Sequence, residues 1–394
     1  MERRLPSRLM VFLAAGGTGG HMVPAHALAG ELRARGHRVQ LITDERGAKI
    51  PGLFEGIERH ILPAGRLGGG LLSYLKAGRA VLAGRRQARL LYRKFRADVV
   101  VGFGGYPAFP ALLAASSAKV PTILHEQNAL LGRVNRLLAG DAAAIATAYA
   151  AVERLKPAYL DKVALVGNPV RESVARLGEM PYPPFDETSP LKILVTGGSQ
   201  GASILSDIVP SGLGTLSPSL RLRLQVVQQC RPDEINRVRA IYTSLRIPAE
   251  LSTYIEDMPA KLEDAHLVIA RAGASTIAEL TAAGRPAILV PLPSAADDHQ
   301  TVNAREIAAA GGARMIRQAE FTHEALARQI EALAEDPQGL ANAAARALSV
   351  GHPHATRDLA DLVERIAGGG SPLLVGPALE ARITSAAPAN GIPA

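Results

Sequence analysis

Glycine-rich turns that directly follow apolar runs are the first feature of this sequence that could do chemistry. They are Gly16-Gly17-Thr18-Gly19-Gly20, Gly102-Phe103-Gly104-Gly105 and Gly197-Gly198-Ser199-Gln200-Gly201. Between a strand and a helix, such a turn lets backbone N–H groups approach a phosphate or a sugar, and the helix dipole favours negative charge there. Glycine also permits tight packing of a helix on a strand. Three such turns at strand ends nevertheless favour ligand binding.

Two side chains near these turns are candidates for a catalytic base. His21 opens the helix after the first turn, where the dipole disfavours the imidazolium and leaves a neutral ring that can accept a proton. The alternative is a capping or packing histidine. The segment His125-Glu126-Gln127-Asn128 ends another apolar strand, beside the same expected cleft, and supplies Glu126 as the second candidate. The residues alone do not decide between the two.

The second half of the chain offers polar groups suited to a nucleotide. The segment Arg271–Glu279 follows a strand and begins a helix, and its small residues let a ligand approach the helix start. Glu279 has two acceptor oxygens that could bind both hydroxyls of a ribose, or it is an ordinary exposed glutamate. His299 stands beside two aspartates, but their spacing matches no familiar set of metal ligands. We therefore expect neither a metal nor a cofactor.

Nicotinamide dinucleotide binding is the main alternative for the first turn. Gly17-Thr18-Gly19 begins the G-x-G-x-x-G pattern, and Asp44 ends the second expected strand, where a ribose-binding acid would stand. Met22 occupies the third glycine position, so the pattern is incomplete. No G-K-[ST] follows any of the turns, which excludes a P-loop.

Strands and helices must position these groups, and the hydrophobic pattern predicts them. Short apolar runs alternate with helix-length amphipathic stretches, which is typical of a parallel sheet covered by helices. The expected strands are 9–15, 38–43, 99–102, 122–125, 143–147 and 163–166, followed after a proline-rich stretch by 192–196, 222–227, 267–270 and 287–290.

Because the pattern of strand, glycine turn and helix restarts in the second half, we expect an α/β protein with two Rossmann-like domains and a ligand cleft between them. A chain of 394 residues also exceeds the size of about 250–300 residues at which single cores stop growing. The expected domains are 1–166, completed by a returning C-terminal helix within 350–367, and 167–349, with a disordered tail at 368–394.

Cysteine content and hydropathy indicate the cellular compartment. The single cysteine, Cys230, excludes an internal disulfide and is typical of a reducing environment. The basic N-terminus and the short apolar run after it resemble a secretion signal, but the run ends in the first glycine turn, which favours a buried strand. No stretch of about 18 apolar residues occurs. We expect a cytoplasmic protein that is soluble or peripheral to a membrane.

Taken in order, the motifs resemble one family, MurG, the UDP-N-acetylglucosamine:lipid I N-acetylglucosaminyltransferases of bacterial peptidoglycan synthesis. The resemblance extends from Leu9 to Ile366 and rests on Gly-Gly-Thr-Gly-Gly-His (16–21), Gly-Phe-Gly-Gly-Tyr-Pro (102–107), His-Glu-Gln-Asn (125–128), Gly-Asn-Pro-Val-Arg (167–171), Gly-Gly-Ser-Gln-Gly-Ala (197–202), Arg271–Glu279 and Asp-His-Gln-Thr-Val-Asn (298–303). It implies a GT-B fold, with two Rossmann-like domains facing across a cleft. It also implies inverting transfer of N-acetylglucosamine (GlcNAc) to the C4 hydroxyl of N-acetylmuramic acid in lipid I, giving lipid II.

The resemblance also implies roles for individual residues. In the second domain, UDP-GlcNAc would contact Ile255 at the uracil, Glu279 at the ribose, Ser199 and Arg171 at the diphosphate, Ala274, Ser275, Thr276, Ile277 and Ala278 along the nucleotide, and Gln300 and Asn303 at the sugar hydroxyls. The first domain would contact the donor sugar through Thr18, Gly19, Gly20 and Asn128, and the acceptor diphosphate through Gly16, Gly17, Gly104, Gly105 and Tyr106. His21 is then the first choice of base and Glu126 the second. A membrane-surface sensor that binds UDP-sugars without catalysis is the alternative from another class.

The basic charge of the chain is concentrated in one segment. From Arg59 to Ala97 there are ten basic residues and no acidic ones. Their ten positive charges exceed the net charge of +8 of the whole chain, so the rest of the chain is slightly acidic. Leucines recur among these charges, which predicts an amphipathic helix or a pair of helices. The residues expected to dock on an anionic membrane are Leu71, Leu72, Leu75, Arg79, Arg85, Arg86 and Arg89.

From this expected docking surface and the lipid-linked acceptor that the resemblance implies, we expect the protein at the cytoplasmic face of the bacterial inner membrane. The alternative for the segment is a solvated basic face over an ordinary core stripe. Nucleic acid is not expected as a partner, because the segment has few aromatic residues and no RNA-binding motif. Proteins of cell-wall synthesis or cell division are further candidate partners.

Overall fold

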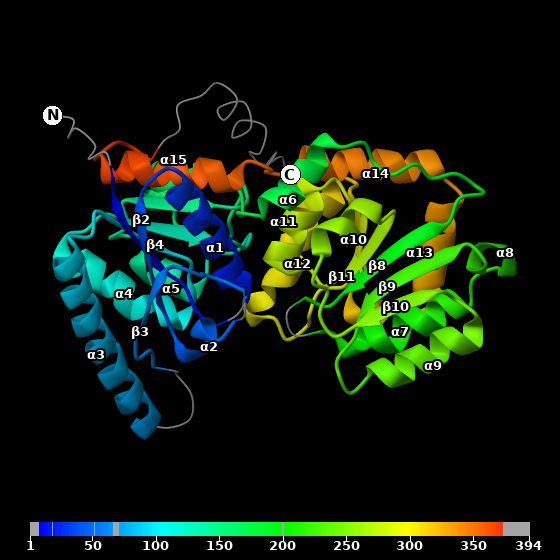
Figure 1. Ribbon diagram of the computed structural model, residues 1–394, viewed down its shortest axis with the longest axis horizontal. Helices are drawn as coiled ribbons and strands as arrows, with labels where there is room; N and C mark the ends of the chain where they lie inside the picture. Colours follow the sequence, from blue (N-terminus) through cyan, green and yellow to red (C-terminus); the bar gives the residue numbers. More distant parts are fainter. Residues whose placement is uncertain (1–7, 18, 51, 66–70, 199–200, 373–394) are drawn as a thin grey trace, which may run out of the picture. The chain divides into compact units, whose positions relative to one another are not determined.

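The structure, a computed structural model, describes residues 8–17, 19–50, 52–65, 71–198 and 201–372 (Figure 1), and for 71–74 the backbone only. The chain divides into two compact units. Unit 1 combines the N-terminal part up to Pro169 with the C-terminal part from His354, and unit 2 is Val170–Pro353. The junctions expected from the sequence, 166/167 and 349/350, lie three and four residues earlier in the chain than these.

Within the described residues, unit 1 contains a parallel sheet of seven strands in the order β3-β2-β1-β4-β5-β6-β7. The strands are β1 (Met10–Ala14), β2 (Arg38–Thr43), β3 (Glu58–Ile61), β4 (Val99–Gly102), β5 (Thr122–Glu126), β6 (Ala144–Thr147) and β7 (Val163–Leu165). Side chains alternate across the central strand. Val11 and Leu13 of β1 belong to the core on one face of the sheet, and Met10 and Phe12 to the core on the other. Burial on both faces explains the continuous apolar run that predicted this strand.

Helices cover the sheet of unit 1. They are α1 (Gly19–Ala34), α2 (Glu45–Ala48), α3 (Leu71–Phe95), α4 (Gly105–Ala118), α5 (Arg133–Leu138), the 3-10 helix η1 (Pro157–Lys162) and α15 (Ala355–Ala367). α15 packs against α1, and α3 packs against α4 (Figure 1). The expected basic amphipathic segment is therefore one helix, α3, whose buried positions Ala77, Ala88 and Tyr92 are spaced for helical packing.

The described part of unit 2 contains a second parallel sheet, of six strands in the order β10-β9-β8-β11-β12-β13. The strands are β8 (Leu191–Thr196), β9 (Leu224–Gln229), β10 (Ala249–Ser252), β11 (Leu267–Ala270), β12 (Ala287–Leu289) and β13 (Ala313–Met315). The helices are α6 (Glu172–Ala175), η2 (Arg176–Glu179), α7 (Ser203–Gly214), α8 (Pro218–Arg221), α9 (Ile235–Leu245), α10 (Met258–Asp264), α11 (Ala274–Ala282), η3 (Ala296–Asp298), α12 (His299–Ala309), η4 (Gln318–Glu320), α13 (His323–Ala334) and α14 (Pro337–Ser349).

The two sheets confirm the predicted α/β fold class, with differences at the sheet edges. The strands β3, β10 and β13 were not predicted, and each is an outer strand of its sheet. Their sequences carry charged or polar side chains on the solvent side and so lack an apolar run. The strand expected at 222–227 begins later, because Leu222 is the C-cap of α8 and is 81% exposed.

Helix α15 is separated from the rest of unit 1 by the whole of unit 2 in sequence, yet it completes the core of unit 1. Leu359 and Val363 are fully buried among side chains of the sheet and of α1. At the surface, Arg35, which directly follows α1, bonds Asp361 at 2.5 Å, and His37 lies 2.8 Å from Glu364. Surface ion pairs stabilise a protein little, so the buried apolar side chains hold this helix in place.

We expect Leu359→Ala to destabilise unit 1 by about 2–5 kcal/mol, because it leaves a cavity under a fully buried side chain. Urea denaturation followed by circular dichroism measures the effect. Leu137→Ala is the matched control, since this leucine of the same unit is 73% exposed and its loss should change stability by at most about 0.5 kcal/mol. Equal effects of the two substitutions would contradict the packing described for α15.

Candidate functional site

The motifs found in the sequence lie at the topological switch point of each sheet. In unit 1 the strand order reverses between β1 and β4, and the first two glycine turns follow these two strands. In unit 2 the order reverses between β8 and β11, which precede the third turn and the Arg271–Glu279 segment. Ligands of open α/β sheets bind at the carboxyl ends of the strands at such a switch point.

The first turn is held by Asp44. The N–H of Gly17 donates to Oδ1 of Asp44 at 3.0 Å, and the same oxygen accepts from the N–H of Gly47 as the cap of α2. Gly16 must be glycine, because a Cβ there would stand 2.5 Å from Cβ of Pro107. Asp44 therefore uses one carboxylate oxygen to hold the turn and to cap α2, which disfavours its use as the ribose-binding acid of a dinucleotide site. Thr18 lies outside the described residues.

His21 extends from α1 against the second turn. Gly104 and Gly105 have φ values of +80° and +75°, and a Cβ on Gly105 would lie 3.4 Å from Cδ2 and Nε2 of the His21 ring. Both turns thus meet at this imidazole, since α1 carries the side chain and the second turn supports its ring. Tyr106, the next residue, is 38% exposed at the start of α4.

Gln127 belongs to this site, although the sequence pattern indicated no role for it. Its Oε1 lies 3.2 Å from Nδ1 of His21, and its side chain is buried. A buried polar residue directly after an apolar strand was the available signal, but only the fold shows which side chain it contacts.

Glu126, the second candidate base, is instead buried and engaged in holding its own loop. Its Oε1 accepts from the backbone and side-chain nitrogens of Asn128, both at 3.1 Å. Its Oε2 accepts from the N–H of Gly132 at 2.7 Å and from Nδ2 of Asn135 at 2.9 Å. With 2% of its surface exposed, this carboxylate has little access to a substrate, which favours His21. Asn128 is fixed in place by the same carboxylate.

The third glycine turn, in unit 2, is anchored by two buried polar side chains. Thr196 at the end of β8 donates to Oε1 of Gln229 at 3.0 Å and accepts from the N–H of Gly198. Gln229 in turn donates to the carbonyl of Gly198 at 3.1 Å. Ser199 lies outside the described residues, so its expected contact with a diphosphate remains a prediction.

Arg171 and Glu279, expected to bind different parts of the nucleotide, contact each other. Nη2 of Arg171 donates to Oε1 of Glu279 at 3.0 Å, and the two side chains are 38% and 17% exposed. Burial raises the pKa of the Glu279 carboxyl, and the charge of Arg171 opposes that rise. Nε of Arg171 is buried and has no hydrogen-bond partner among the described residues. The pair therefore retains donor and acceptor capacity for a ligand.

The start of α11 lies beside this pair. Gly273 is its N-cap and provides no side-chain cap, so the first N–H groups of the helix, at Ala274, Ser275 and Thr276, have no acceptor within the helix and could bind an anion. The hydroxyl of Ser275 is buried and has no partner in the part of the chain that the structure describes. Ile277 is buried in the core, while Ala278 is half-buried next to Glu279.

Other predicted sugar and nucleotide contacts have structural partners within unit 2. Asn303 is fully buried and donates to the carbonyl of Ala272 at 3.4 Å. Gln300 accepts from the N–H of Leu292 at 3.0 Å, so its amide N–H groups point elsewhere. The side chain of Ile255 is 7% exposed and packs in the core, which leaves its backbone as the group expected at the uracil.

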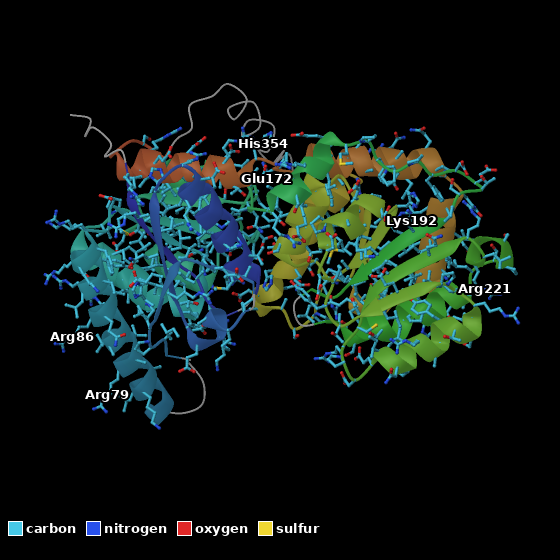
Figure 2. The ribbon with its side chains drawn as sticks, in the orientation of Figure 1. Arg79, Arg86, Glu172, Lys192, Arg221 and His354 are labelled. Carbon is cyan, nitrogen blue, oxygen red and sulfur yellow. The ribbon has the colours of Figure 1, made fainter. Side chains whose placement is uncertain are left out.

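The outer face of α3 combines exposed leucines with arginines. Leu75, Leu82 and Leu90 are 61%, 63% and 57% exposed. Arg79, Arg86 and Arg89 are exposed and Arg85 is half-buried, and Figure 2 shows Arg79 and Arg86 extending away from unit 1. The backbones of Leu71 and Leu72 belong to the helix, but their side chains lie outside what the structure describes.

No described helix has both the length and the apolarity needed to cross a membrane. No group of three or more histidine, cysteine or acidic side chains gathers as metal ligands in the described ranges, and His299 instead contacts the carbonyl of Ala296 at 2.8 Å.

Similarity to known proteins extends over most of the chain. Residues 11–147 match the glycosyltransferase family 28 N-terminal domain, and residues 192–365 match the C-terminal domain of the same family. A protein of Erythrobacter litoralis is 61% identical over 90% of this chain and 89% of its own length, and one of Zymomonas mobilis is 59% identical over 90% and 92%. Both are named UDP-N-acetylglucosamine--N-acetylmuramyl-(pentapeptide) pyrophosphoryl-undecaprenol N-acetylglucosamine transferase.

Solved structures agree with this assignment. The crystal structure of Acinetobacter baumannii MurG matches with a TM-score of 0.71 and 29% identity, over 91% of this chain and 99% of that one. The calicheamicin glycosyltransferase CalG4 shares the fold at 17% identity, with a TM-score of 0.57 over 97% of this chain and all of that one. The fold is thus the GT-B fold of glycosyltransferases. The chain belongs to glycosyltransferase family 28 and, within it, to the MurG family.

Proposed function

We propose that this protein transfers GlcNAc from UDP-GlcNAc to the C4 hydroxyl of N-acetylmuramic acid in lipid I, the undecaprenyl diphosphate-linked acceptor, and so forms lipid II for peptidoglycan synthesis. The observation that carries the proposal is 61% identity, over 90% of the chain, to a protein named for this transfer. The geometry supports it, because a histidine site and a nucleotide-type site occupy the switch points of the two sheets.

Unit 2 is proposed to bind the donor. The ribose hydroxyls would donate to the carboxylate of Glu279, and the diphosphate would accept from Arg171 and from the helix start after the third glycine turn. The backbone of Ile255 would contact the uracil, and Gln300 and Asn303 would lie nearest the sugar. Negative charge develops on the diphosphate as its bond to C1 breaks, and Arg171 with the dipole of α7 would stabilise that charge.

Unit 1 is proposed to bind the acceptor and to supply the base. The turns that contain Gly16, Gly17, Gly104 and Gly105, with Tyr106, would hold the diphosphate of lipid I through backbone N–H groups. His21 would take the proton from the C4 hydroxyl while its oxygen attacks C1 from the face opposite UDP, which inverts the anomeric configuration. Gly19, Gly20 and Asn128, with Thr18, would contact the donor sugar.

Transfer of radiolabelled GlcNAc from UDP-GlcNAc to a lipid I analogue tests the proposal directly. We expect a labelled product with the β-1,4 linkage and a signal that depends on both substrates. A protein that binds UDP-GlcNAc but forms no product would instead be a sensor. Stabilisation by NADH but not by UDP in a thermal-shift experiment would favour the dinucleotide alternative.

We expect His21→Ala to lower kcat on the order of 10²- to 10⁴-fold, because a positioned general base contributes about that much. The dissociation constant of UDP-GlcNAc should change little, since unit 2 binds the nucleotide. His26→Gln on the same helix is the control, because glutamine retains the acceptor that the N–H of Phe54 uses. Unchanged turnover in His21→Ala would remove this residue from the mechanism.

We expect Glu279→Ala to weaken UDP binding about 10- to 100-fold, because the variant loses hydrogen bonds from the ligand to a charged carboxylate. The ribose assignment predicts more: 2′-deoxy-UDP should bind wild type more weakly than UDP does, and the variant should no longer distinguish the two ligands. Isothermal titration calorimetry measures all four affinities. Glu172→Ala, in the neighbouring helix α6 and paired with Arg176 at the surface, is the control (Figure 2). A variant that still discriminates between the ligands would place the ribose elsewhere.

Unit 1 is also proposed to dock on the cytoplasmic leaflet of the bacterial inner membrane through α3. The leucines of its outer face would enter the interface, and its arginines would contact anionic headgroups, where each basic side chain contributes about 1 kcal/mol. Docking brings unit 1 to the surface that contains its lipid-linked acceptor. Proteins of cell-wall synthesis or division are further proposed partners at that surface.

We expect Arg79→Glu/Arg86→Glu to reduce binding to phosphatidylglycerol-containing vesicles by about 10-fold or more, since two attractions become repulsions. Cosedimentation at fixed salt measures the bound fraction. Arg239→Glu/Arg328→Glu changes two exposed arginines of unit 2 and has the same net charge, so it separates a local effect from total charge. Binding that is equal for both double variants, or independent of anionic lipid, would refute docking through α3.

A further inference from the structure

A row of buried hydrogen bonds connects His21 to a backbone carbonyl at the end of unit 1. The row runs from His21 through Gln127 and His125 to the carbonyl of Gly167. His125 is fully buried and Gln127 is 2% exposed. Because a carbonyl oxygen only accepts, the position of each proton can be deduced along the row, starting from Gly167.

The carbonyl of Gly167 determines the state of His125. Nε2 of His125 lies 3.0 Å from this oxygen, so Nε2 must carry a proton. Burial lowers the pKa of His125 to about 4, so near neutral pH the ring carries no second proton. Nδ1 of His125 is therefore the unprotonated nitrogen and acts as an acceptor.

His125 and Phe103 then determine the orientation of the Gln127 amide. Its nitrogen lies 2.9 Å from Nδ1 of His125 and 3.1 Å from the carbonyl oxygen of Phe103. Both of these atoms accept hydrogen bonds, so the amide N–H₂ group must face them. The amide oxygen is consequently the atom presented to His21.

Gln127 in turn determines the tautomer of His21. The amide oxygen lies 3.2 Å from Nδ1 of His21 and can only accept, so Nδ1 must carry the proton. In the neutral ring, Nε2 is then the unprotonated nitrogen. This is also the nitrogen next to Gly105, in the turn that the proposed function assigns to the acceptor diphosphate.

We propose that Gln127 is a positioning residue that, supported by His125 and the carbonyl of Gly167, holds His21 in the tautomer that accepts a proton at Nε2. The proposal rests on the proposed role of His21 as the base. In the reaction, Nε2 forms a bond to the hydrogen of the acceptor hydroxyl, and the O–H electron pair forms the new O–C1 bond. The bond from C1 to the diphosphate breaks, and UDP leaves with that electron pair.

A spectroscopic measurement tests the tautomer without any need for activity. The protein is labelled with ¹⁵N-histidine, the ring nitrogens are observed by NMR at neutral pH, and His21→Gln assigns the His21 signals. We expect a protonated Nδ1 and unprotonated Nε2 for His21, and the opposite pattern for His125. An Nε2–H tautomer of His21, or an averaged mixture of the two, would overturn the proposal.

Gln127→Met tests the consequence for catalysis, because methionine has a similar size but its thioether sulfur is only a weak acceptor for Nδ1–H. We expect kcat to fall on the order of 10- to 100-fold with KM for both substrates nearly unchanged, and the His21 signals to lose the Nδ1–H pattern. Gln40→Met is the matched control. Gln40, in β2, is also a buried glutamine of unit 1 that bonds a histidine, but this histidine is His60 of the outer strand β3.

Equal kcat values for Gln127→Met and Gln40→Met would overturn the positioning role, as would a rise in KM with kcat unchanged. If Gln127→Met does not fold, the wild-type spectrum alone decides. Failure of the proposed function has a different signature: His21→Ala would retain full turnover whatever the NMR spectrum of His21 shows.

Discussion

The site of unit 1 depends on one close backbone approach and on left-handed backbone conformations that glycine adopts readily and other residues rarely do. A Cβ at Gly16 would overlap Pro107, and Gly105 lies against the imidazole of His21 with a positive φ. Because the two turns follow adjacent strands at the switch point of the sheet, α1 can bring the histidine of one turn onto the backbone of the other. Asp44, Gln127 and the other hydrogen-bond partners maintain an arrangement that these contacts make sterically possible.

The site of unit 2 combines a similarly anchored glycine turn with a pair of charged side chains. Its third turn is anchored from below by Thr196 and Gln229, as Asp44 anchors the first. What differs is the neighbouring ion pair, since Arg171 and Glu279 satisfy each other in part and keep unfilled capacity next to the start of α11. A partly buried charge without a partner is costly, so a pair that a nucleotide can join is preferable to two isolated charges.

The sequence predicted those features that local patterns encode. Buried central strands have continuous apolar runs, so β1 and β11 were predicted within one or two residues, whereas the outer strands β3, β10 and β13 have no such run. The turns and the positions of His21 and Glu279 were likewise visible. The different contacts of Glu126 and Gln127 could not be predicted, because the two are adjacent polar residues. Only the fold brings Glu126 to Asn135 and Gln127 to His21.

We propose that unit 2 binds the nucleotide and that unit 1 holds the base and the acceptor. Hydrogen–deuterium exchange of the full chain, with and without saturating UDP, tests it most directly. We expect protection of backbone amides in the third turn and at the start of α11, with residues 16–21 and 102–107 unchanged. Protection confined to the turns of unit 1 would contradict it.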